Sequence, residues 1–217
     1  MPAWLLLAAL VSQPAQANDT DWLVQVRPGA RRNFYDGYET GCPALTARCR
    51  RAGYVVAGDQ LVASLQKGVF TYVIFINRVG KASTGWVETV ALARITPPPP
   101  TNAAWIGSWS RTEASIEIKP AARRGWFEVG GWASWGGSDP DRVARGAVNI
   151  GEMEGEIALS DGRLTAATGD VVRHLPPENP DDFDCRVQLR LLGPYLIAED
   201  NNQCGGVNVS FSGVYRK

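Results

Sequence analysis

The sequence predicts an all-β protein in which a small barrel is followed by an antiparallel β-barrel of seven or eight strands. Apolar and polar residues alternate strictly from Phe183 to Leu191, which is the period-two pattern of a strand with one buried face. The chain from Trp105 to Lys217 contains no convincing helical period. Four consecutive prolines, Pro97–Pro100, divide the sequence into two halves.

The chain begins with a segment typical of a signal peptide, residues 1–17. An apolar run from Ala3 to Val11 precedes Ala15-Gln16-Ala17, which fits an A-x-A cleavage site, although the usual basic start is missing. A short buried helix is the alternative, because the run is too short to span a bilayer. We therefore expect a periplasmic or secreted protein with no membrane span after cleavage.

The charge balance argues against nucleic acid as a partner. The sequence contains 22 Lys and Arg residues and 22 Asp and Glu residues, and none of them lies in the predicted signal peptide. A neutral chain without runs of basic residues lacks the positively charged surface that binds a phosphate backbone.

Four cysteines fit an oxidising compartment and allow three disulfide pairings. We favour Cys42–Cys49 and Cys185–Cys204, because each pair is local and lies within one predicted domain. A zinc site would need short C-x-x-C spacings or histidine ligands, and the single histidine, His174, stands alone. We expect neither a metal nor a cofactor.

The proline run predicts an extended, semi-rigid linker, since consecutive prolines favour a polyproline II rod without backbone donors. A ligand motif for another protein is the alternative. The sequence then divides into the signal peptide (1–17), a first domain (18–95), the linker (96–104) and a second domain (105–217).

The first domain is expected to consist of short strands. β-Branched and aromatic residues concentrate between turn residues, which is typical of strands. The expected strands are Tyr54–Val56, Leu61–Leu65, Val69–Asn77 and Thr84–Val87.

Three short segments of this domain, Gly58–Val62, Gln66–Phe70 and Thr84–Glu88, resemble a bacterial SH3-type barrel. In that superfamily a lysine–glycine turn leads into a long strand and then a glycine–tryptophan strand, which ends here at Ala91-Leu92. The sequence departs from the pattern in lacking the R-x-G-P-x turn, which Arg27-Pro28-Gly29 only loosely matches. The resemblance implies a peptide-binding groove, and Trp86 is the candidate binding residue.

The second domain is expected to contain successive strands separated by turns. Asp161-Gly162 is a strong hairpin signal, and closure into a barrel would remove free edges. The expected strands are Trp105–Ser110, Ser115–Lys119, Trp126–Trp135, a pair flanking Ser160–Arg163, and Cys185–Leu192, Tyr195–Glu199 and Val207–Tyr215.

Gly107-Ser108-Trp109 and Arg216 resemble calycin-type barrels. There a G-x-W tryptophan plugs one barrel end and a C-terminal basic residue packs across it, so the resemblance implies that Arg216 stacks on Trp109. The end of the chain, from Cys185 to Arg216, is similar to secreted proteobacterial proteins without an assigned activity, which implies a family and not a mechanism.

Trp126, Trp132 and Trp135 lie close together in the sequence and are candidate binding residues. Exposed tryptophans beside glycines could stack on sugar rings of a cell-wall ligand. The more common use is to fill the interior or rim of a barrel. On one strand, Trp126 and Trp132 would share a face and Trp135 would take the other.

Several acidic segments and the single histidine are candidate sites. The loop Pro176–Asp182, with Asp184, is best interpreted as a solvated connection, with calcium binding or a plug for a hydrolase cleft as alternatives. Glu152 and Glu154 on one strand face could support glycosidase chemistry, but are more simply solubilising. His174 has no nucleophile beside it in a known motif.

The sequence therefore predicts a non-enzymatic binding protein without catalytic residues, whose SH3-like module engages a peptide or cell-wall material such as peptidoglycan. One alternative is an inhibitor of a secreted hydrolase such as lysozyme, with a secreted protein as its partner. Another is a small-ligand-binding calycin-like barrel, and a third is an enzyme with an unrecognised carboxylate site.

Overall fold

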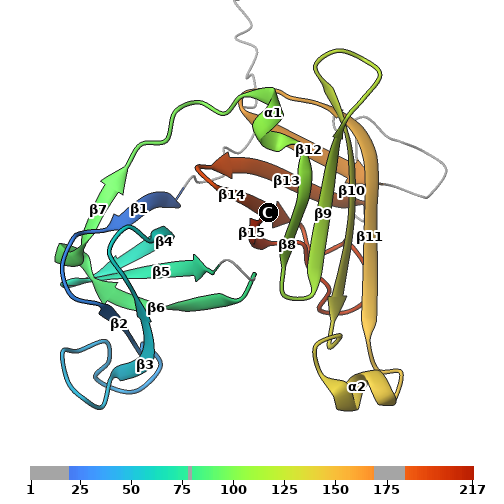
Figure 1. Ribbon diagram of the computed structural model, residues 1–217. Helices are drawn as coiled ribbons and strands as arrows, with labels where there is room; N and C mark the ends of the chain where they lie inside the picture. The colour runs from blue at the N-terminus through green and yellow to red at the C-terminus, as the bar shows by residue number, and fades with distance from the viewer. Residues whose placement is uncertain (1–19, 78–79, 169–183) are drawn as a thin grey trace, which may run out of the picture.

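The protein forms two antiparallel β-sheets, one on each side of the proline run, which confirms the predicted all-β class (Figure 1). The computed structural model describes residues 20–77, 80–168 and 184–217, so the predicted signal peptide lies outside it. Among the described residues, no helix has the length and apolar character needed to cross a membrane.

The first sheet has seven strands in the order β3-β2-β6-β5-β4-β1-β7. A 3-10 turn, η1 (Thr89–Ala91), connects the last two in the chain. The strands are β1 (Trp22–Val26), β2 (Arg32–Tyr35), β3 (Arg50–Val55), β4 (Gln60–Lys67), β5 (Phe70–Ile76), β6 (Ala82–Glu88) and β7 (Leu92–Ile95). Its inner face holds a core of alternating residues: Val24, Val26, Phe34, Val55, Leu61, Ala63, Val73, Val87 and Leu92.

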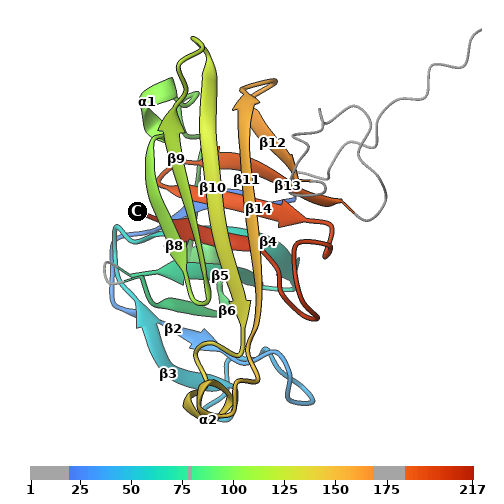
Figure 2. The same cartoon turned by 90° about the vertical axis from the view of Figure 1, so that its right-hand side faces the viewer.

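The second sheet has eight strands in the order β11-β10-β9-β8-β15-β14-β13-β12. Its long strands β9, β10 and β11 lie on the side away from the first sheet (Figure 2). The strands are β8 (Gly107–Arg111), β9 (Ala114–Pro120), β10 (Trp126–Trp135), β11 (Asn149–Ala158), β12 (Arg163–Thr168), β13 (Cys185–Leu192), β14 (Tyr195–Asp200) and β15 (Gly213–Arg216).

This second sheet is a nearly closed barrel, as predicted. Its two edge strands, β11 and β12, are joined by the expected hairpin turn, where Asp161 and Gly162 take φ values of 49° and 72°. Positive φ at both central residues is what a type I′ turn requires. Ser160 and Arg163 form an isolated bridge beside the turn, so the two edges meet at this point.

The sequence located most strands but missed the shortest elements. Strands β1, β2 and β7 have five residues or fewer. Two short helices, α1 (Asn102–Trp105) and α2 (Pro140–Ala144), were also missed, and α1 contains Trp105, which was expected to begin a strand. Single-turn helices leave too few residues for a 3.6-residue period to stand out.

Side chains fill the barrel interior. Alternate residues of each strand point inward and pack into one cluster. Trp105 belongs to this cluster and is itself fully buried. The cluster includes Trp109, Ile116, Ile118, Phe127, Val129, Met153, Ile157, Leu164, Val187, Leu189, Leu196, Phe211 and Tyr215. The interior is therefore a packed core.

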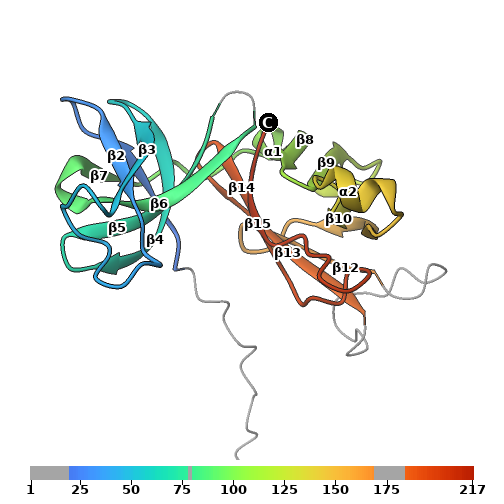
Figure 3. The same ribbon diagram turned by 90° about the horizontal axis from the view of Figure 1, so that it is seen from below.

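A second apolar cluster joins the two sheets. Strand β14 is buried on both faces, because Tyr195 and Ile197 point out of the barrel while Leu196 and Ala198 point in. Strands β14 and β15 lie on the barrel side that faces the first sheet (Figure 3). The inter-sheet cluster comprises Leu23, Val62, Ile76, Tyr195, Ile197 and Val214, with Ile74, Ile95 and Leu192 at its margin.

Polar contacts surround this apolar cluster. The Tyr195 hydroxyl donates to the Gln60 carbonyl over 2.5 Å, and Arg216 donates to the Ile76 carbonyl over 2.6 Å. Arg190 forms an ion pair with Asp21 at 3.0 Å. The two sheets are thus held together by specific hydrogen bonds as well as by apolar burial.

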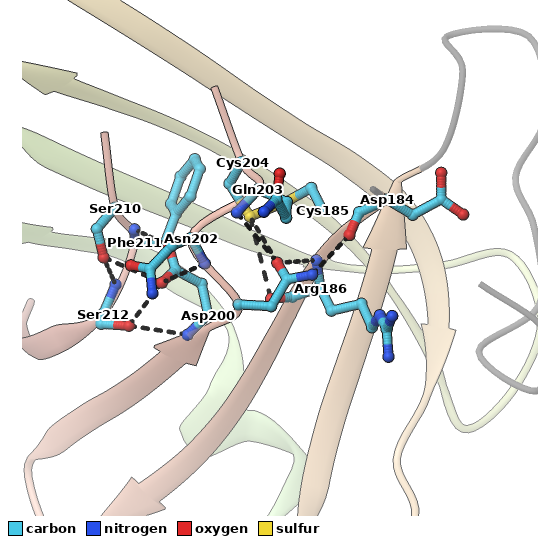
Figure 4. Close-up of a disulfide and its surroundings, with 11 residues drawn as sticks. Asp184, Cys185, Arg186, Asp200, Asn202, Gln203, Cys204, Ser210, Phe211 and Ser212 are labelled. Carbon is cyan, nitrogen blue, oxygen red and sulfur yellow. Dashed lines mark hydrogen bonds between the residues drawn. A yellow bond between two sulfur atoms is a disulfide. The ribbon is translucent and has the colours of Figure 1, made fainter. Parts of the chain in front are cut away.

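The predicted strand Val207–Tyr215 is wrong over its first six residues, because only Gly213–Arg216 forms strand β15. The Asp200 carboxylate instead organises the preceding residues as a loop, accepting hydrogen bonds from Phe211 N–H at 2.6 Å and from the Ser212 hydroxyl at 2.8 Å (Figure 4). Val209 and Phe211 still point into the core, which explains the alternating pattern.

Both predicted disulfides are present, Cys42–Cys49 and Cys185–Cys204. The second ties the loop after β14 to the start of β13. The loop then approaches β11 so closely that a Cβ on Gly151 would lie 1.8 Å from the Cys204 carbonyl oxygen, and Gly206 N–H donates to the Ile150 carbonyl at 3.1 Å. The loop therefore covers the barrel beside β11, one of its edge strands.

We predict that Tyr195→Phe lowers the free energy of unfolding by about 1–3 kcal/mol, because the Gln60 carbonyl loses its buried donor. Burial raises the pKa of Tyr195 to about 12, above the value of about 10 for an unfolded tyrosine. The protonated hydroxyl therefore stabilises the fold fully below pH 10, and this contribution is lost as the pH rises to 12.

Urea unfolding at pH 8, 10 and 11.5 measures this difference, which should shrink as the pH rises. Tyr38→Phe, at a side chain that is 93% exposed, is the matched control and should leave stability unchanged. Equal stability of wild type and Tyr195→Phe at all three pH values would show that Tyr195 contributes through packing alone.

Candidate functional site

An aromatic groove crosses the outer face of the first sheet, the face that also contacts the barrel. It encloses about 260 Å³. Its lining residues are Tyr35, Gly37, Tyr38, Arg51, Leu65, Tyr72, Thr84, Gly85 and Trp86. The candidate residue Trp86 lies within this groove.

Strand register builds the floor of the groove. Leu65 pairs with Tyr72, Tyr72 pairs with Trp86, and Trp86 pairs with Tyr35, so the four side chains form one row across β4, β5, β6 and β2. The Tyr72 and Trp86 rings meet edge to face, with centroids 5.4 Å apart. Paired side chains on one face of a sheet restrict each other's rotamers, which pre-organises this aromatic surface.

A tight loop after β2 forms the wall of the groove. Asp36 accepts hydrogen bonds from Tyr38 N–H at 2.7 Å and from Glu39 N–H at 3.3 Å. The Tyr38 bond is the main reason that the pKa of Asp36 lies below its usual value. Next to it, Gly37 packs on the Trp86 indole, so this loop positions both Tyr38 and Trp86.

The Cys42–Cys49 disulfide fixes the far side of the same loop. Both half-cystines are buried in a small cluster with Tyr35 and Phe70, whose rings meet edge to face at 5.1 Å. Closing so short a ring restricts the unfolded chain and holds the loop near the sheet. The disulfide is therefore a support of the groove wall.

A basic cleft adjoins the aromatic groove and shares Arg51 and Thr84 with it. The cleft encloses about 500 Å³ between β3 and β6 and adds a second cation, Lys81. Arg51 donates to the Thr84 carbonyl at 2.8 Å. No acidic side chain lines either hollow within the part of the chain that the structure describes.

Strand β6 has an open edge along this cleft, where the Thr84 carbonyl accepts from Arg51 instead of from a neighbouring strand. Among the described residues, β2 pairs with β6 only at Tyr35 and Trp86, so residues 82–84 have no strand on that side. An open stretch of strand edge can accept an extended peptide as an added strand.

The tryptophans of β10 do not form one platform. Trp126 and Trp132 share the outer face, separated there by Glu128 and Gly130, and Trp132 is 42% exposed. Trp135 points the other way and packs against the barrel core. Cations cover two of these rings, with Arg123 at 4.2 Å from Trp126 and Arg142 at 3.9 Å from Trp135.

Trp109 lies in the barrel core, where its indole N–H donates to the Trp105 carbonyl at 2.9 Å. The expectation that Arg216 stacks on it is wrong, because the cation over the Trp109 ring is Lys217, at 4.5 Å. Alternation along β15 explains the difference: Tyr215 points into the barrel, so Arg216 points out, toward Ile76 of the first sheet.

Glu152 and Glu154 lie on the outer face of the barrel and belong to an acidic surface over β9–β11. A shallow hollow of about 340 Å³ lies there, centred on Gly130, which pairs with both Glu117 and Glu154. Lys119 forms an ion pair with Glu117 at 2.8 Å. His174 and the loop Pro176–Asp182 lie outside the described residues.

The sequence predicted Trp86 as a binding residue but gave no prediction for Tyr35, Tyr38, Tyr72 or Arg51, which also line the groove. One signal was available, since Tyr72 alternates with the core residues Thr71 and Val73 and so faces outward. The contact of Tyr38 with this face depends on the loop, and that of Arg51 depends on the pairing of β3. Neither can be deduced from a local pattern.

No known protein family, curated protein or solved structure matches the chain. Its assignment to a fold class therefore rests on its own strands and their order.

We predict that Gly37→Ala lowers the free energy of unfolding by about 1–3 kcal/mol, the usual cost of overpacking. The new Cβ would lie 2.2 Å from the Trp86 indole nitrogen, so the ring must move. Urea unfolding and the indole N–H chemical shift measure the two effects.

Gly130→Ala is the matched control, because a Cβ there meets no atom within 4 Å. It should be neutral or slightly stabilising. Unchanged stability and an unchanged indole shift in Gly37→Ala would show that the loop yields without affecting Trp86.

Proposed function

We propose that the protein is a non-enzymatic binding protein of the cell envelope that holds an extended, acidic peptide on its first, SH3-like sheet. The observation that carries the proposal is the continuity of the aromatic groove at Trp86 with the basic cleft at Arg51 and Lys81. The open edge of β6 beside them supports the extended conformation.

The groove suits a peptide better than a compact small molecule. Its volume of about 260 Å³ lies below the range typical of drug-sized ligands. One apolar side chain would pack between Tyr72 and Tyr38, while carboxylates further along the peptide would meet Arg51 and Lys81. The Trp86 indole N–H has no hydrogen-bond acceptor among the described residues, so a peptide carbonyl could accept from it.

Peptidoglycan is the ligand that combines these features, because its stem peptides are short and rich in carboxylates. The two disulfides support a periplasmic or secreted location, since such bonds persist in oxidising compartments. The packed barrel interior does not favour the alternative of a small-ligand-binding barrel.

We predict that the mature protein sediments with purified peptidoglycan sacculi and that Trp86→Leu weakens this binding at least tenfold, because Trp86 is the centre of the aromatic row. Tyr38→Ala, at a largely exposed side chain, should weaken binding without affecting the fold. Sedimentation at several sacculus concentrations gives the affinities. Calorimetry with a synthetic stem peptide and its fully amidated form tests the contribution of the carboxylates.

Trp132→Leu is the control, as it removes an exposed tryptophan from the barrel instead. Equal binding by wild type and by both groove variants would contradict the proposal. A parallel titration with lysozyme tests the inhibitor alternative. The peptide proposal would be overturned if the protein bound lysozyme tightly but did not bind sacculi, and if Trp86→Leu bound lysozyme as tightly as wild type.

A further inference from the structure

We infer a second binding site, on the inner face of the first sheet, for a small carboxylate ligand with an aromatic or apolar body. The site is a cleft of about 390 Å³ between the β1–β7 edge of the sheet and the η1 end of β6. It is independent of the proposed peptide groove, which lies on the opposite face.

The floor of the cleft is part of the apolar core. Val24 and Leu92 line it and are 2% and 7% exposed. Trp22 shares the inner face of β1 with Val24, since the two are separated by one residue. A ligand in the cleft would therefore rest on apolar surface beside an indole ring.

A cation stands over this apolar surface. Arg94 pairs with Val24 in the strand register, which places both on the same face, and its guanidinium carbon lies 5.4 Å from the centroid of the Trp22 ring. Within the described residues Arg94 has no carboxylate partner, and no acidic side chain lines the cleft. A planar guanidinium without a partner is suited to a bidentate bond with a carboxylate.

The opposite wall supplies neutral donors. Thr71 is 1% exposed, and its hydroxyl lies 2.9 Å from the Thr89 hydroxyl. Only one hydrogen is used between two hydroxyls, so the other can be donated to a ligand. Gln66 adds an amide without a hydrogen-bond partner among the described residues.

These groups together define the ligand class. The lining offers a guanidinium, a hydroxyl, an amide and the Trp22 indole N–H, against an apolar floor, so it matches an acceptor-rich anion with a compact apolar part. The volume lies within the range of small-molecule sites.

The test uses hippurate, an aromatic acyl glycine, with its neutral amide, hippuramide, as the matched probe. Titration of the mature protein is followed by the NMR signal of the Trp22 indole N–H, assigned from a Trp22→Phe variant. We expect a saturable shift with hippurate and at least tenfold weaker binding of hippuramide and of the Arg94→Gln variant, as for a lost charged hydrogen bond.

Arg31→Gln is the control variant, because Arg31 stacks on Tyr54 of β3, at the opposite edge of the sheet. It should bind hippurate as wild type does, and so should Tyr38→Ala, which separates this site from the peptide groove. The absence of a saturable shift, or equal affinities for hippurate and hippuramide, or an unchanged affinity in Arg94→Gln, would overturn the inference.

Discussion

The arrangement of the molecule depends on one constraint: the barrel presents an apolar outer surface that cannot remain in water. Tyr195, Ile197 and Val214 point away from the barrel core, yet each is at most 7% exposed, because the first sheet covers them with Leu23, Val62 and Ile76. Burying such side chains contributes about 1.5–3 kcal/mol each. The two sheets therefore stabilise each other, and packing between them sets the position of the first sheet relative to the barrel.

The same constraint places the aromatic groove. Successive outward residues of β5 serve three purposes: Phe70 packs under the disulfide loop, Tyr72 lines the groove, and Ile74 and Ile76 contact the barrel. The groove thus lies between two anchored regions of one sheet face. Aromatic side chains held in this way lose little conformational entropy on binding, which favours affinity per unit of buried area.

Sequence patterns predicted the features that depend on neighbouring residues. Alternation located β13, the concentration of β-branched and aromatic residues located β5, and local spacing located both disulfides. Patterns failed where long-range contacts decide the outcome, as at Val207–Phe211, where alternate residues enter the core from a loop organised by Asp200. Lys217 lies over Trp109 where Arg216 was expected, because neighbouring residues of a strand point to opposite faces. The aromatic row of the groove depends on the register of four strands, which no local pattern specifies.

The two proposed sites share strand β5 without sharing a face. Thr71 points into the inner cleft and the next residue, Tyr72, points into the outer groove, because side chains alternate along a strand. Leu65 and Gln66 of β4 are divided between the two sites in the same way, so a ligand at one site would influence the other by shifting β4 or β5. Both strands are hydrogen-bonded on both sides, and Val62, Ile74 and Ile76 pack at the barrel contact, so a shift would disrupt the cluster that joins the sheets. Occupation of the two sites should therefore be energetically independent.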